Sequence, residues 1–125
     1  VIYFNKRLVV RMSFKNLEPM EINRSEMGTW THPAFSEYMN ENLKNEEYVS
    51  SDEWKKFKNH FDVDTVIFWM ESSVSPDDWE IMMDDSDITK WEPIAPNGFF
   101  LIDINFSEDD AYAIFARNKR ECEEA

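Results

Sequence analysis

A stretch near the C-terminal end of the sequence most restricts the folds that this chain can adopt. Residues 97–117 read NGFFLIDINFSEDDAYAIFAR, in which two apolar runs, 99–105 and 111–117, flank a polar cluster. Both runs are rich in aromatic and β-branched residues, and the cluster includes Glu108, Asp109 and Asp110. Strand-forming runs separated by turn residues are typical of a β-hairpin. We therefore predict a hairpin whose strands lie in the core of a sheet.

Residues 65–70, TVIFWM, predict a further strand, which we expect to pair with the hairpin. Six consecutive strand-forming residues without polar alternation favour a strand that is buried on both faces. Weaker strands are predicted at residues 8–14, 20–23 and 88–91.

Three short helices are predicted between these strands. The first covers residues 34–43, with Pro33 in its first turn and Thr31 or His32 just outside it. The second covers residues 52–60, is capped by Ser50 or Ser51, and carries Trp54, Phe57 and Phe61 on one face. The third starts after Ser75 and ends near residue 84, because a serine cap, a proline and two acids in the first turn are strong start signals.

These elements predict one α+β domain over residues 1–125: a small antiparallel or mixed sheet with a C-terminal β-hairpin, packed by two or three short helices. Apolar residues make up 42% of the chain, and aromatic residues make up 15% of it. This supplies enough apolar side chains for a core. We interpret residues 1–11 as a non-core extension, with Met12 as a candidate start, and residues 118–125 as a charged tail.

The net charge of −13 is concentrated in one part of the chain. Residues 62–110 contain fourteen acidic residues and a single base, Lys90, whereas acids and bases balance in the rest of the sequence. Clustered negative charge attracts a basic partner and repels nucleic acid and anionic membranes. A solvated acidic face without a partner is the alternative interpretation.

The sequence carries no recognisable catalytic or metal-binding motif. The isolated glycines Gly28 and Gly98 cannot form a phosphate-binding loop. Two histidines and one cysteine, far apart, do not make a zinc site, and an EF-hand starting at Asp85 would place Lys90 where glycine is required. We predict no catalytic residue, no metal and no cofactor. An irregular divalent-ion site or a carboxylate pair remains an open alternative.

The single cysteine, Cys122, and the lack of an apolar run of ~18–20 residues favour the cytoplasm of a bacterial host. We expect neither direct nucleic-acid binding nor membrane binding.

We predict that carboxylates of residues 77–110, with two tryptophans as apolar anchors, bind the partner. Same-side carboxylates on a strand recur about every 6.6 Å, and DNA presents one phosphate per strand for each ~3.4 Å of its axis, so such a cluster can imitate a phosphate array. Trp30 and Trp91 are expected at the surface because they lie in loop-like sequence beside threonine and proline. The predicted partner-binding residues are Asp77, Asp78, Glu80, Asp84, Asp85, Asp87, Glu108, Asp109, Asp110, Trp30 and Trp91.

Two segments, EINRSEMGTWTHPAF (21–35) and KWEPIAPNGFFLIDINFSEDDAYAIFAR (90–117), together with TVIFWM between them, resemble small acidic proteins of bacteriophages and plasmids. The resemblance implies a mobile-element setting, in which such proteins often inhibit host restriction or CRISPR machinery. It carries over no functional residue.

The first hypothesis is a non-enzymatic inhibitor of a basic nucleic-acid-binding host protein, of the anti-CRISPR or anti-restriction type, acting as a nucleic-acid mimic. The second is an immunity protein that neutralises a basic nuclease toxin, and the third is a small enzyme with a carboxylate or divalent-metal site. Whether the chain forms a homodimer is left open.

Overall fold

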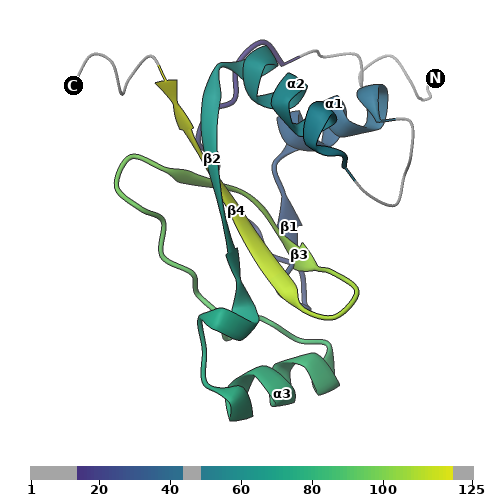
Figure 1. Cartoon of the computed structure of the whole chain (residues 1–125). Coiled ribbons are helices and arrows are strands. Elements are labelled where there is room, and N and C mark those ends of the chain that lie inside the picture. Colours follow the sequence, from purple (N-terminus) through teal and green to yellow (C-terminus); the bar gives the residue numbers. More distant parts are fainter. Residues whose placement is uncertain (1–13, 44–48, 120–125) are drawn as a thin grey trace, which may run out of the picture.

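The computed structural model describes residues 14–43 and 49–119, which form an antiparallel sheet and three α-helices (Figure 1). The sheet order is β1-β3-β4-β2. The strands are β1 (Trp30–Thr31), β2 (Val63–Trp69), β3 (Phe100–Phe106) and β4 (Ala111–Asn118). The predicted α+β class and the C-terminal β-hairpin are confirmed.

The hairpin β3–β4 is the centre of the sheet, because β4 also pairs with β2 along the whole length of that strand, from Val63↔Asn118 to Trp69↔Tyr112. The predicted pairing of residues 65–70 with the hairpin is therefore right. The predicted burial on both faces is wrong: β2 lies at an edge of the sheet, and Ile67 and Trp69 are 43% and 41% exposed. The apolar run of β2 is unbroken because one face of the strand packs in the core and the other face is covered over part of its length.

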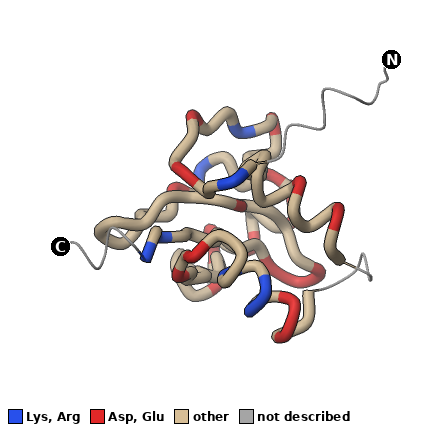
Figure 2. Tube along the Cα trace, turned by 90° about the horizontal axis from the view of Figure 1, so that it is seen from above, with Lys and Arg blue, Asp and Glu red and all other residues tan. Residues whose placement is uncertain are grey.

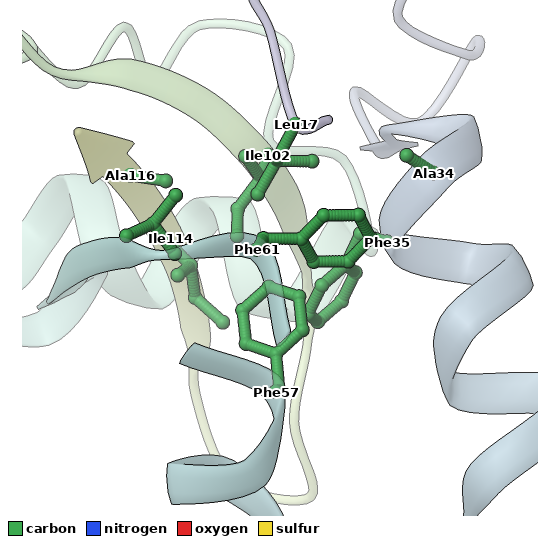
Figure 3. Packing of buried hydrophobic residues seen from close by; sticks show 9 residues of the cluster. Leu17, Ala34, Phe35, Phe57, Phe61, Ile102, Ile114 and Ala116 are labelled. Atoms are coloured by element: carbon green, nitrogen blue, oxygen red, sulfur yellow. The ribbon is translucent and has the colours of Figure 1, made fainter. Parts of the chain in front are cut away.

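Helices α1 (Pro33–Asn42) and α2 (Ser51–Phe61) pack on one face of the sheet. His32 begins α1: its Nδ1 accepts a hydrogen bond from Ala34 N at 3.0 Å, and its Nε2 donates to Glu18 O at 2.6 Å. Ser50 and Glu53 form a capping box at the start of α2. Phe35, Phe57 and Phe61 then meet Ile102 and Ile114 of the sheet (Figure 3).

On the opposite face of the sheet lies a second core, to which residues 86–99 contribute Ile88 and Trp91, and α3 (Pro76–Asp85), beyond the end of the sheet, contributes Met82. Ala113 and Phe115 belong to this second core, whereas Ile114 and Ala116 belong to the first, as expected when alternate residues of a strand point to opposite faces. Ser75 Oγ accepts from Asp78 N at 3.1 Å, which confirms the predicted cap of α3. Figure 1 shows α1 and α2 near one end of the sheet and α3 beyond the other.

Two of the weaker strand predictions are wrong, and the third lies mostly outside the described residues. Residues 20–23 form no strand, and residues 88–91 form a turn. The turn is held by backbone acceptors rather than by a sheet: Arg24 donates to Ile88 O at 2.7 Å and to Trp91 O at 2.9 Å. Gly28, at φ +95, allows this approach, since a Cβ there would lie 2.7 Å from Thr89 N. Residues 8–13, with the non-core extension, and Cys122, in the charged tail, are not among the described residues.

Candidate functional site

Two separate acidic segments meet at one end of the molecule. Helix α3 carries five carboxylates and Asp87 follows it, while Glu108, Asp109 and Asp110 form the turn between β3 and β4. Trp79 of α3 donates its indole N–H to Asp110 Oδ1 at 2.9 Å, and the backbone N–H of Glu71 donates to the same oxygen at 3.1 Å. The contact places the helix beside the hairpin turn. We call the exposed carboxylates of these two segments the acidic surface: Asp77, Asp78, Glu80, Asp84, Asp85, Glu108 and Asp109.

Two of the predicted partner-binding acids, Asp110 and Asp87, use their carboxylates for hydrogen bonds within the fold. Asp110 is half-buried and holds Trp79, as described. Asp87 accepts hydrogen bonds from Thr89 N at 2.9 Å and from Thr89 Oγ1 at 2.7 Å, and these bonds lower the pKa of Asp87. Its Oδ1 closes the turn that follows α3.

The bases in the described part of the chain form no ion pair with the acidic surface. Within residues 14–43 and 49–119, no lysine or arginine lies within 4 Å of its carboxylates. Along the trace in Figure 2, acidic positions recur on many segments and basic positions are few. On α3, Asp77, Glu80 and Asp84 follow the i, i+3, i+7 spacing of one helix face, on which neighbours lie about 5–6 Å apart.

The two predicted tryptophan anchors lie in the core to different degrees. Trp91 is only 4% exposed and packs with Met82, Ile88 and Phe115, so its predicted surface position is wrong. Trp30 is half-buried in β1, where its ring lies 5.9 Å from the ring of His32. A different apolar residue is available on the acidic surface: Ile81 lies between Asp78 and Asp85 on α3 and is 59% exposed.

Sequence reasoning missed a buried carboxylate in β3. Asp103 is 4% exposed and accepts three hydrogen bonds from uncharged groups of three strands. Thr31 Oγ1 and Asn105 Nδ2 donate to Oδ1 at 2.9 and 2.6 Å, and the Tyr112 hydroxyl donates to Oδ2 at 2.8 Å. Burial raises the pKa of Asp103, and the three hydrogen bonds oppose that shift. Burial and the neighbouring carboxylate of Asp103 also raise the pKa of Tyr112.

An irregularity in the hairpin aims Asp103 to the side of α1 and α2. Leu101 pairs with Phe115 and Asp103 pairs with Ile114, so Ile102 is an extra residue between two successive partners. Such a bulge re-aims side chains locally. The signal in the sequence was the pair Asp103 and Asn105, two polar residues spaced by two inside the apolar run FLIDINF.

Asp103 lies at a groove of about 720 Å³ on this face of the sheet. Its walls come from α1, α2 and the sheet, and they are mainly apolar and aromatic. The lining includes Trp54, Lys58, Ile67, Trp69, Asp103 and Tyr112.

The described residues contain no group of three or more His, Cys, Asp or Glu side chains placed to hold a metal ion. His32 is occupied at the start of α1, and burial lowers its pKa. His60, at the end of α2, lies against the rings of Tyr38 and Phe61, with centroid distances of 5.0 and 4.6 Å. Of the helices in the described parts of the chain, none is long and apolar enough to cross a membrane.

Comparison with protein-family models, with curated proteins and with solved structures finds no match to this chain.

Proposed function

We propose that the chain is a non-enzymatic binding protein whose acidic surface occupies the nucleic-acid-binding surface of a basic protein. One observation carries the proposal: the Trp79–Asp110 hydrogen bond joins α3 to the hairpin turn and so unites two acidic segments in one unneutralised surface. A partner that normally contacts phosphates with lysine and arginine would find a set of exposed carboxylates there.

The chemistry of this surface narrows the class of partner. Basic nucleic-acid-binding proteins and nucleases share a surface that attracts polyanions, and electrostatic attraction speeds their encounter with an acidic protein. An inhibitor of a host defence enzyme, as the resemblance to phage and plasmid proteins suggests, and an immunity protein against a nuclease toxin would both use this surface. Ile81 supplies exposed apolar area inside it.

The test is affinity capture from bacterial lysate with a matched pair of charge-reversed proteins. One carries Asp84→Lys, Asp85→Lys and Asp109→Lys, and the control carries Glu18→Lys, Glu21→Lys and Glu41→Lys, which are also exposed and change the net charge by the same amount. We expect the native chain and the control to retain nucleic-acid-binding proteins at low salt, and to lose them when salt rises or duplex DNA competes. The first variant should retain at least tenfold less.

Equal retention by the two variants would show that total charge, not the acidic surface, governs binding. A captured nuclease whose cleavage of DNA stops on binding would identify the immunity function. A bound partner that duplex DNA does not displace would contradict nucleic-acid mimicry.

A further inference from the structure

The carboxylate of Asp103 forms no ion pair with any described base, although Lys58 lines the same groove. Its three hydrogen-bond donors are two hydroxyls and one amide, and no base lies within 4 Å of it in the described part of the chain. Burying an unpaired charge is costly, whereas an uncharged asparagine of similar shape would avoid that cost. Residues that break the rules of stable packing are expected at functional sites.

The groove above Asp103 has the dimensions and lining of a small-molecule site. Ligand pockets commonly enclose about 300–1,000 Å³ and combine apolar walls with a few polar groups, and this groove measures about 720 Å³. Trp69 and Ile67, both more than 40% exposed, form an apolar rim, and the Trp69 ring lies 5.8 Å from the ring of Tyr112. Helices α1 and α2 pack at the other end of this sheet face, so the rim stays open to solvent.

We propose that this groove binds an organic cation, a protonated amine on an apolar or aromatic body. The ammonium group pairs with the carboxylate of Asp103, which has about four acceptor positions and uses three of them. The body of the ligand lies against Ile67 and Trp69, where an aromatic face also attracts a cation. Anions are disfavoured by Asp103 and by the net charge of −13.

Among the described residues, three titratable side chains line the groove: Asp103, Tyr112 and Lys58. Lys58 of α2 is the one that opposes the proposal, because its ammonium group repels a bound cation. Replacing it by methionine keeps the length of the side chain and removes the charge. For a ligand that carries an amine and no carboxylate, Lys58→Met therefore strengthens binding.

The test compares three probes of the same shape: 3-phenylpropylamine, 3-phenylpropanol and 3-phenylpropionate. Isothermal titration gives the affinities near neutral pH, and the indole N–H signals of Trp54 and Trp69 report where the probe binds. We expect the amine to bind at least tenfold more tightly than the alcohol or the acid and to shift both indole signals. Asp103→Asn should weaken amine binding at least tenfold, and Glu21→Gln, an exposed change of equal charge, should leave it within twofold.

Trp69→Ala keeps the test decisive if Asp103→Asn does not fold, since Trp69 lies at the exposed rim of an edge strand. It should weaken the amine severalfold, and Lys58→Met should strengthen it. Binding of the alcohol as tight as that of the amine would overturn the proposal, and so would amine binding that neither Asp103→Asn nor Trp69→Ala weakens. Absence of amine binding at 10 mM probe would also overturn it.

Discussion

At the scale of single residues, Asp103 shows how burial and hydrogen bonding compete. Removal from water disfavours the charged carboxylate, whereas Thr31, Asn105 and Tyr112 favour it by donating hydrogen bonds. Burial is the larger effect, so the pKa of Asp103 is raised in the folded state. Ionisation of Asp103 is therefore less favourable in the folded protein than in the unfolded chain, and it lowers the free energy of unfolding.

This balance predicts that Asp103→Asn raises the free energy of unfolding relative to the native chain, by an amount that increases with pH. Because the pKa is raised on folding, the native protein loses stability as pH rises from the ordinary range of an aspartate through the raised pKa of Asp103. Asparagine does not ionise, so the stability of the variant relative to the native chain should rise over that interval. The gain is about 1.4 kcal/mol for each unit of the shift. Urea unfolding at a series of pH values between 3.5 and 8 measures it.

Glu21→Gln is the matched control, because Glu21 is exposed and its replacement removes the same charge. Its stability relative to the native chain should show no comparable rise. A relative stability of Asp103→Asn that falls with increasing pH would mean that the three hydrogen bonds outweigh burial and that the folded pKa is lowered.

At the scale of secondary-structure elements, the position of α3 depends on one carboxylate of the hairpin turn. Asp110→Ala removes the acceptor for Trp79 Nε1 and for the backbone N–H of Glu71. A half-buried donor without a partner costs about 1–2 kcal/mol, so the free energy of unfolding should fall by that amount. Asp109→Ala, beside it and exposed, should change stability by less than ~0.5 kcal/mol. Equal effects in urea unfolding would contradict a structural role for Asp110.

The elements that the sequence predicted well are those with local signals. Ser50 and Ser75 cap their helices as expected, and the apolar runs of the hairpin become β3 and β4. What failed depends on distant contacts. The burial of Trp91 and the turn at residues 88–91 require Arg24, which is more than sixty positions away in the sequence. The direction in which the side chain of Asp103 points depends on a β-bulge, which the alternation of apolar and polar residues along the strand does not predict.

The same distinction holds for the candidate sites. The acidic segments were visible in the sequence because charge is a property of composition, but their union through Trp79 and Asp110 was not. The groove was invisible, because its walls come from two helices and three strands that meet only in the folded chain. Asp103 and Asn105 were the accessible hint, as polar residues in an apolar strand.

At the scale of the whole molecule, the sheet separates the two proposed sites. The groove lies on the face that carries α1 and α2, whereas α3 lies beyond the end of the sheet and packs with the second core, on the opposite face. The sites share no residue. Charge reversal on the acidic surface should therefore leave the indole signals of the groove in place, so that failure of one proposal does not entail failure of the other.

The excess charge of the whole chain also predicts how its stability depends on salt. With a net charge of −13, the acidic side chains repel one another in the folded state. The one basic residue within 62–110 cannot offset this repulsion. The screening length falls from about 30 Å at 0.01 M salt to about 8 Å at 0.15 M, which weakens this repulsion. We expect the thermal midpoint to rise by about 3–6 °C over that range, equivalent to ~1 kcal/mol for a chain of this length.

Neutralising Asp84, Asp85 and Asp109 to asparagine should raise the midpoint at low salt and reduce the salt dependence. A midpoint that falls as salt is added would instead show that attraction between unlike charges, such as Asp64 and Arg117 at 3.4 Å, dominates the folded state.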